Sequence, residues 1–437
     1  MTTTAPTDLP IAPEVTDPSL YLEGIPEERF AEMRATPGLM WHPYEEGGFW
    51  AVTRHADVKE VSRNSQIFSS AIGHTNLWDS EADALEARRS LIDTDAPDHT
   101  RLRRLIAKSF TPKNVRVWEG TVRSITAELL DEFIASGGGD WVEKVAAPLP
   151  IRVILTMLGV PIEDADYLVE LSNYLVEGTG DQQSIPPDAF GNTTELRLLP
   201  FNSPASHALF EYGEKLAELR RAEPQDDLVT TLVEAAGEEG NRLSPSEFRN
   251  LFHLLVFAGN ETTRTAISHG AMALADHPDQ WGQIRSALAT DDGALVDSAV
   301  EELLRWSTPV LHMRRTTSEA TQLAGTSIEA GQKVVMFYCS ANRDEAVFEN
   351  PFTFDITRDA ADQFAFGGGG HHLCLGAFLA RLELAILLEE MASRNMRLTR
   401  TSEPKRARSN FVHGVLSVDL DVEIDAEIDA DVDGGGS

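Results

Sequence analysis

The stretch Phe366-Gly367-Gly368-Gly369-Gly370-His371-His372-Leu373-Cys374-Leu375-Gly376 leads into AFLARLELAILLEEM, whose apolar residues recur at helical spacing. Four consecutive glycines give the backbone little bulk, so a flat group can approach it closely. Cys374 stands at the opening of the helix expected over Cys374–Ser393, where unsatisfied N–H groups and the helix dipole stabilise a thiolate. A thiolate in this position is typical of the proximal ligand of a haem iron.

Other sites built on glycine or cysteine fit this stretch less well. A dinucleotide loop needs G-x-G-x-x-G, but counted from either of the first two glycines the sixth position is His372 or Leu373. A phosphate loop needs a lysine, which the stretch lacks. A zinc site made from His371, His372 and Cys374 has no fourth clustered ligand, so a zinc hydrolase is a remote alternative. A buried structural cysteine is the ordinary alternative, but packing alone does not require four glycines.

A second unusual segment is the helix expected over Ser244–Asp276, which would span about 50 Å at 1.5 Å per residue. It opens with a capping box, Ser244 followed by Glu247. Its centre, LFHLLVFA, is apolar nearly all round and must be buried. The sequence AGNETT at residues 258–263 then breaks the apolar run with weak helix formers and a carboxylate, which is costly to bury. Such a break in the middle of a core helix indicates a functional position.

Helical patterns dominate the rest of the chain, so we expect a mainly α fold with a minor β part, organised as one domain. Besides the two helices above, the patterns predict helices over Glu27–Arg34, Ala56–Asn64, Asp98–Phe110, Trp118–Ala135, Ser203–Arg221, Asp279–Ala289 and Val296–Trp306. Short strands are expected at Phe49–Thr53, Gln322–Leu323 and Lys333–Tyr338.

Composition narrows the class of protein. The chain has 437 residues, 42% of them hydrophobic, which is ample for a large core. Its formal net charge of −33 makes nucleic acid an unlikely partner, because the overall field repels phosphates. The two cysteines fit a reducing cytoplasm. The first basic residue is Arg29, which argues against a secretory signal, and no apolar run is long enough for a transmembrane segment.

Both ends of the chain differ in pattern from its centre. Residues 1–17 are rich in Thr and Pro without periodicity, and we expect a flexible leader there. From Val418 to Asp433 apolar residues alternate with eight carboxylates, which predicts a short final strand that frays into a solvated acidic tail. The expected division is therefore a leader at 1–17, a main domain at 18–420 and an acidic tail at 421–437.

The glycine–cysteine loop resembles the haem-binding signature of the cytochrome P450 family, and four further motifs follow in that family's order. Residues 258–263 match its A-G-x-D/E-T-T motif, Glu302 to Arg305 its E-x-x-R, and His99 to Arg103 its H-x-x-x-R, while Arg315 stands where another haem-contacting arginine is expected. The resemblance covers roughly residues 20–417. One departure is Gly367, which occupies a position that is commonly aromatic; Phe366 lies one residue earlier.

The resemblance implies a single-domain P450 fold with the long central helix over the haem, and it assigns roles to individual residues. Cys374 would be the axial thiolate of haem b iron. His99, Arg103, Arg315 and His372 would bind the haem propionates. Glu261 and Thr262 would relay protons on the distal side, although Thr262 can instead bond back to the carbonyl of Ala258 and kink the helix. Glu302 and Arg305 would form a buried structural pair supporting the haem loop, the alternative being an ordinary surface ion pair.

The resemblance also implies a monooxygenase that inserts one atom of O2 into an unactivated C–H bond. The expected pocket residues are mostly apolar and predict a hydrophobic substrate: Leu254, Phe257, Ala258, Val310, Leu311 and Val412. Several segments are similar to bacterial members that hydroxylate terminal carbons of methyl-branched lipids, terpenoids or sterol side chains. A monooxygenase acting on a more polar natural product, and a haem protein without oxygenase activity (a sensor or carrier), stay open as alternatives.

One segment departs from the acidic character of the chain. Residues 99–118 contain no acid but carry Arg101, Arg103, Arg104, Lys108, Lys113 and Arg116. Such a basic patch suits an acidic electron carrier, and the resemblance implies a ferredoxin, served by a ferredoxin reductase. A solvated basic helix without a partner is the alternative.

Overall fold

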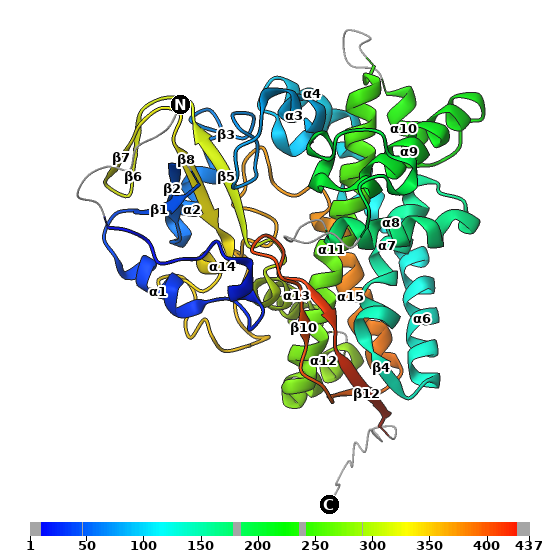
Figure 1. Ribbon diagram of the computed structural model, residues 1–437. Helices are drawn as coiled ribbons and strands as arrows, with labels where there is room; N and C mark the ends of the chain where they lie inside the picture. Colours follow the sequence, from blue (N-terminus) through cyan, green and yellow to red (C-terminus); the bar gives the residue numbers. More distant parts are fainter. Residues whose placement is uncertain (1–9, 46, 178–184, 236–241, 291, 426–437) are drawn as a thin grey trace, which may run out of the picture.

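Helices gather on one side of the molecule and a mixed β-sheet on the other, with the long helix α11 between them (Figure 1). The computed structural model describes residues 10–45, 47–177, 185–235, 242–290 and 292–425. The helices of this part of the chain are α1 (Glu27–Ala35), α2 (His55–Arg63), α3 (Ala82–Arg88), α4 (Asp98–Ala107), α5 (Pro112–Val115), α6 (Glu119–Ala135), α7 (Pro148–Leu158), α8 (Ala165–Glu177), α9 (Pro204–Ala222), α10 (Leu228–Glu234), α11 (Pro245–Asp276), α12 (Pro278–Ala289), α13 (Gly293–Ser307), α14 (Tyr338–Ala341) and α15 (Ala377–Ser393).

The strands are short, as the sequence indicates. They are β1 (Met40–Tyr44), β2 (Gly47–Val52), β3 (Phe68–Ser69), β4 (Gly138–Asp140), β5 (His312–Thr317), β6 (Thr321–Leu323), β7 (Thr326–Ile328), β8 (Lys333–Phe337), β9 (Met396–Arg400), β10 (Lys405–Arg406), β11 (Val415–Ser417) and β12 (Asp419–Ile424). All nine predicted helices and the three predicted strands form, with ends displaced by at most three residues. The mainly α class with a minor β part is therefore confirmed.

The largest sheet has the order β1-β2-β8-β5-β3, in which only the β2–β8 pair is parallel. Side chains alternate between its two faces. Trp50 and Val334 lie in one apolar cluster with Trp41 and Val58, whereas their neighbours Phe49 and Val335 lie in a second cluster. Both faces are thus covered, which explains why β8 is buried along its whole length and is apolar after Lys333.

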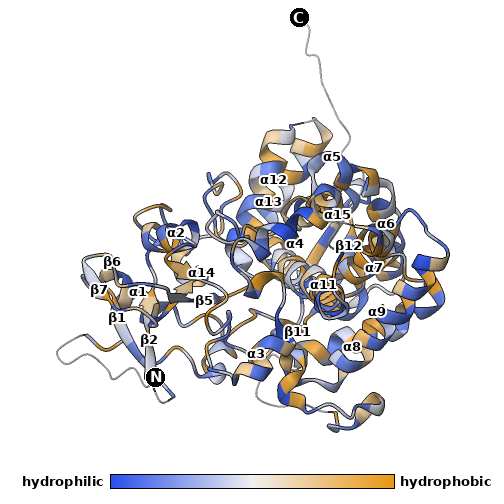
Figure 2. Cartoon of the chain, turned by 90° about the horizontal axis from the view of Figure 1, so that it is seen from above, coloured by the Kyte–Doolittle hydropathy of each residue, from blue (hydrophilic) through white to orange (hydrophobic). Residues whose placement is uncertain are grey.

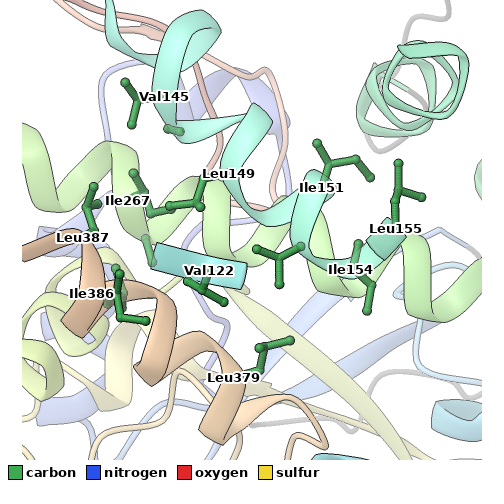
Figure 3. Packing of buried hydrophobic residues seen from close by; sticks show 14 of the residues in the cluster. Val122, Val145, Leu149, Ile151, Ile154, Leu155, Ile267, Leu379, Ile386 and Leu387 are labelled. Carbon is green, nitrogen blue, oxygen red and sulfur yellow. The ribbon is translucent and has the colours of Figure 1, made fainter. Parts of the chain in front are cut away.

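The helical side is organised around α11, which begins at the predicted capping box and is buried along most of its length. It packs against α7, α8, α9 and α13. Figure 3 shows Leu149 of α7 and Leu387 of α15 beside Ile267 of α11, all three in one apolar cluster. The periodicity does not predict α7, because Pro148 and Pro150 interrupt its apolar run; both prolines occupy the first turn, where proline is tolerated.

The structure moves both boundaries of the expected main domain. Residues 10–17 are not a free leader: Ile11 pairs with Trp41 beside β1, and Val15 is 1% exposed. The apolar side chains of this segment fill a gap beside the sheet, so it belongs to the packed fold. At the other end β12 continues past residue 420 to Ile424, because it pairs with both β9 and β4. The rest of the expected leader and tail lies outside the described residues.

Along α8 and α9, hydrophobic and hydrophilic residues alternate at helical spacing, as expected for helices with one buried face (Figure 2). Within the described ranges, none of the helices combines the length and the apolar character needed to span a bilayer.

Candidate active site

One face of α11 stays uncovered by protein side chains although the helix runs through the core. Ala258 is exposed, and Leu254 and Thr262, one turn to either side, are partly exposed, whereas their neighbours Phe257 and Glu261 are buried. Residues four apart share one face of a helix, so these three positions form a continuous strip. Two of the expected pocket residues of α11, Leu254 and Ala258, therefore stay accessible, whereas the third, Phe257, is buried.

The glycine–cysteine loop is held tightly against the end of α2. A Cβ on Gly368 would lie 2.6 Å from the Cβ of Ser62, and one on Gly370 would lie 2.7 Å from the Ser62 carbonyl oxygen. Gly370 also has φ +75°, a conformation that L side chains rarely adopt. At least two of the four glycines are thus required for packing the loop against α2, a contact that the sequence analysis did not foresee.

Cys374 lies three residues before the first residue of α15, not within the helix as predicted. Its N–H donates to the carbonyl of Phe366 at 3.0 Å. Protein surrounds the thiol on most sides and raises its pKa, against the opposing effects of the Gly376 N–H and of Arg103, yet the side chain keeps one open face. Such a thiol ionises readily only when a metal ion binds it.

Basic and imidazole groups converge on the same region. The rings of His99 and His372 are 4.3 Å apart, and the Nε2 atom of His99 is buried without a hydrogen-bond partner. Burial and the nearby cations Arg103 and Arg315 lower the pKa of His99 to about 4 and that of His372 to about 2. Both imidazoles are therefore neutral at pH 7 and can donate one N–H each.

The two arginines of this cluster carry uncompensated charge. Arg315 is 4% exposed, and burial lowers its pKa; its guanidinium donates to the Arg314 carbonyl at 2.7 Å. Arg103 donates to the carbonyl of Leu373 at 2.6 Å. In the described part of the chain, neither arginine forms an ion pair with a carboxylate. A buried cation needs an anionic partner, so this cluster suits a ligand that brings carboxylates.

Together, the uncovered strip of α11, the thiol of the glycine–cysteine loop and the cationic cluster beside that loop fit a flat group that carries a metal and two carboxylates. Haem has these three properties. A family model described as Cytochrome P450 matches residues 18–412. The chain belongs to the cytochrome P450 family. Haem with a thiolate-ligated iron is the cofactor that family and fold imply, and the residues present accommodate it.

Relatives of this P450 carry monooxygenase or hydroxylase names. The chain is 38% identical over 434 residues to a steroid C26-monooxygenase of Rhodococcus jostii, covering 96% of this chain and 87% of the relative. It is 39% identical to a methyl-branched lipid omega-hydroxylase of Mycobacterium tuberculosis, covering 89% and 88%. The P450 is therefore a monooxygenase, and the alternative of a haem sensor or carrier loses its support.

Solved structures confirm the P450 fold over nearly the whole chain. A Mycobacterium marinum cytochrome P450 in complex with pseudoionone superposes with a TM-score of 0.83 at 35% identity, covering 95% of this chain and 100% of the other. A Bacillus megaterium cytochrome P450 in complex with testosterone gives 0.74 at 34% identity, covering 91% and 99%.

The pair Glu302–Arg305 of the P450 is fully buried, in contrast to an ordinary surface pair. Both side chains are 0% exposed and make two contacts, at 2.6 and 2.7 Å. Arg305 also donates to the carbonyls of Asn342 and Pro351, and the Asn342 side chain accepts the N–H of Phe364 at 2.8 Å. This chain of contacts leads from α13 to the start of the glycine–cysteine loop.

Glu261 and Thr262 are adjacent in sequence but point to different surroundings. The Thr262 hydroxyl lies on the uncovered strip and donates to the Ala258 carbonyl at 2.9 Å, which is the back-bond considered above. Glu261 is buried and lies beside Gly414 and 3.7 Å from Arg264. Burial raises the pKa of Glu261, with Arg264 opposing it. Arg264 was not predicted from the sequence, although it lies three residues after Glu261, a spacing that makes two helical side chains neighbours.

The remaining pocket residues divide between two environments. Val310 and Val412 form an antiparallel bridge, and Phe257 packs against Phe201 at 4.2 Å between ring centroids. Leu311 instead lies in the apolar cluster on one face of the sheet, together with Phe337, so its contact with substrate stays a prediction. Phe201 comes from the irregular segment before α9 and has no sequence signal beyond its aromatic character.

Proposed function

We propose that this P450 hydroxylates a terminal carbon of a hydrophobic, methyl-branched lipid or sterol side chain with electrons from a ferredoxin. The observation that supports the proposal is the strip Leu254–Ala258–Thr262, where two apolar side chains and one hydroxyl stay uncovered on an otherwise buried helix. Phe257 and Phe201 extend the apolar wall away from that hydroxyl. The names of the relatives, which specify the C26 and omega positions, support attack at a chain terminus.

In this proposal Cys374 would supply the thiolate that holds the haem iron, and His99, Arg103, Arg315 and His372 would hold the haem carboxylates. The bound haem would supply the activation of O2 and the oxidation of the C–H bond. The neutral imidazoles donate N–H groups, while the two arginines contribute the positive charge. Because Arg315 is buried, its attraction to a carboxylate is weakly screened and fixes the cofactor's orientation.

Proton delivery falls to Thr262 and Glu261. The Thr262 hydroxyl lies on the uncovered strip, where it would hold a proton to donate and would be reprotonated by water. Glu261 faces away, but its raised pKa allows it to carry a proton nearer neutral pH than an exposed glutamate would. Rotation of the Glu261 side chain from Arg264 towards Thr262 would connect the two groups.

Replacing Thr262 with alanine should uncouple the enzyme. We expect electron consumption to continue while hydroxylated product per electron pair falls by about tenfold or more, because the proton donor on the open face is lost. The measurement compares product, hydrogen peroxide and reductant consumed. Thr263→Ala is the matched control, since Thr263 is buried and off the strip. Unchanged coupling in Thr262→Ala would contradict the assigned role.

Substrate class is tested by adding branched fatty acids, terpenoids and sterols to the ferric holoenzyme. We expect a saturable low-spin to high-spin shift with branched lipids or sterols and hydroxylation at the terminal methyl group. The physical reason is that burial of apolar surface supplies the binding energy at about 25 cal/mol per Å². Exclusive binding of polar natural products, or oxidation only at internal ring carbons, would contradict the proposal.

The electron carrier has a suitable docking surface. A depression of about 460 Å³, named the basic groove, lies between α5 and the glycine–cysteine loop and is lined by Lys59, Arg63, Arg103, Phe110, Phe378 and Arg381, among others. Lys108, Lys113 and Arg116 are exposed beside it, and across the described ranges none of these three has an ion-pair partner. A field of this sign attracts an acidic iron–sulfur protein. A separate ferredoxin reductase and the reducing cytoplasm complete this proposal.

The double substitution Lys113→Gln and Arg116→Gln should weaken the carrier contact. We expect the KM for an acidic ferredoxin to rise about tenfold at low salt and the difference to shrink as salt screens the charges. Substrate-induced spectral shifts should not change. Lys215→Gln is the control, because Lys215 is exposed but lies on α9, away from the cations that follow α4 and border the groove. Equal KM values for the double variant and its parent at low salt would argue against docking here.

A further inference from the structure

We propose that the acidic C-terminal segment, residues 426–433, binds the basic groove of its own chain. The segment carries Glu427, Asp429, Asp431 and Asp433 and no basic residue. Nothing in the proposed reaction uses it. Its attachment point, its length and the charge of the groove together support this contact.

The segment starts close to one end of α15, and the groove lies at the other end. Asp425, the residue before it, donates its N–H to the carbonyl of Asn395 at 3.0 Å, two residues after α15 ends. Ala377, the first residue of α15, lines the groove, and α5 packs against α15 along the way. The attachment point and the groove are therefore separated by no more than the length of one helix along this route.

The segment is long enough for this distance. With 17 residues, α15 spans about 25 Å at 1.5 Å per residue. The eight residues from 426 to 433 reach about 27 Å when extended at about 3.4 Å each. Lys113 lies in α5, which packs against α15, and Arg116 directly follows α5. An extended segment is thus long enough to run the length of α15.

Charge supplies the second argument. Two half-buried arginines of the helical side have acidic partners: Arg123 contacts Glu389 at 2.6 Å, and Arg394 contacts Asp131 at 2.7 Å. Around the groove, by contrast, Arg63, Lys108, Lys113 and Arg116 form no ion pair with any described residue. Lys59 and Arg381 of the lining do have acidic partners, Asp362 and Glu301. In a chain with 70 acids and 37 bases, the four cations that no described acid pairs are a favourable place for acids from elsewhere in the sequence.

The pattern of the segment also matches the surface. Acids alternate with Ala426, Ile428, Ala430 and Val432, so an extended segment presents acids on one face and apolar groups on the other. Beside the basic residues the structure exposes Val117 (77%) and Phe378 (47%), which are apolar. An extended acidic–apolar segment can cover both kinds of group at once, whereas a purely acidic chain would leave the apolar ones in water.

The bound segment would compete with the electron carrier. This competition rests on the carrier docking proposed above, whereas the contact between the segment and the groove is independent of it. Because the segment is tethered, its effective concentration at the groove is on the order of millimolar. A carrier must therefore displace the segment, and rising salt would weaken the binding of both the segment and the carrier to the groove. The bound segment would lower the apparent affinity of the groove for electron carriers. Carriers with a stronger acidic patch would displace it more readily.

The direct test measures binding of a fluorescent synthetic peptide of residues 426–437 to haem-loaded protein by anisotropy. Two proteins are compared: the full chain and a chain ending at Asp425. We expect the peptide to bind the shortened chain at least about tenfold more tightly, because the tethered segment no longer occupies the groove. Binding should disappear at about 1 M salt, where the Debye length is about 3 Å.

Variants separate charge from length and locate the site. In a full-length chain with Glu427→Gln, Asp429→Asn, Asp431→Asn and Asp433→Asn, the peptide should bind as to the shortened chain. Adding Lys113→Gln and Arg116→Gln to the shortened chain should reduce peptide affinity about tenfold, while Lys215→Gln should not. Equal peptide affinity for full and shortened chains, or no effect of the groove substitutions, would overturn the proposal.

The carrier assay makes failure of the two proposals distinguishable. Peptide binding in the expected pattern supports the intramolecular contact by itself. If the KM for ferredoxin is then unchanged by Lys113→Gln and Arg116→Gln, only the carrier site is rejected. If the groove substitutions raise that KM but the peptide binds neither chain, the carrier site holds and the tail contact is rejected. If two copies exchange their segments, the affinity of the peptide for the full chain will depend on protein concentration. That result would also reject an intramolecular contact.

Discussion

Replacing Cys374 with histidine should abolish hydroxylation while leaving a ligand for the iron. Histidine is a competent haem ligand, but it lacks the electron donation of a thiolate that favours O–O cleavage. We expect product formation to fall by about three orders of magnitude, equivalent to about 4 kcal/mol in the barrier. The carbon monoxide difference spectrum of the reduced protein should lose its strongly red-shifted Soret band and move to a histidine-like position.

Cys339→Ser provides the matched control for this substitution. Cys339 is the other cysteine of the chain; it is fully buried in the cluster on one face of the sheet, and burial raises its pKa. Its replacement should leave the red-shifted band and the turnover unchanged. A red-shifted band that survived in Cys374→His would show that another sulfur binds the iron and would contradict the assignment of Cys374.

Replacing Arg305 with methionine should strongly destabilise the P450. The substitution leaves the Glu302 carboxylate fully buried with only the Asp355 N–H and Arg358 nearby. Removing one partner of a buried pair costs about 3–5 kcal/mol of the free energy of unfolding. The carbonyls of Asn342 and Pro351 lose their donor as well, and through Asn342 the glycine–cysteine loop loses support. We therefore expect lower haem content per chain and a lower denaturation midpoint.

An exposed ion pair serves as the control for this experiment. Arg400→Met breaks the pair with Asp276, which lies at the surface, and should cost less than about 1 kcal/mol. The double variant Glu302→Leu and Arg305→Met should recover part of the lost stability, because no unpaired charge stays buried. If Arg305→Met retained full stability and haem content, the pair would not support the loop.

Much of the helical architecture could be predicted from the sequence, because helix signals are local. Three such signals are the capping box at Ser244, the apolar period of the segment before Asp276 and the apolar run after Gly376. Each signal is complete within a few helical turns. The elements that were missed break a local rule. In α7 the prolines of the first turn interrupt the helical pattern of a buried helix. The mostly polar strand β5 (HMRRTT) is buried only because β3 and β8 flank it.

The candidate site divides in the same way. The sequence by itself determined the residue types and their spacing: the thiol after a run of glycines, the acid and hydroxyl in the middle of α11, and the E-x-x-R pair on one helix face. These are short-range features, since each motif is complete within about ten residues. They were sufficient to indicate a P450 and its class of chemistry.

Only the tertiary structure decided how those residues face one another. It placed Gly370 against Ser62, directed Glu261 towards Gly414, and left the Ala258 strip of α11 uncovered. The two contacts among these join segments that are more than 100 residues apart. Side-chain direction at such distances depends on how whole helices pack, and no local period encodes that packing.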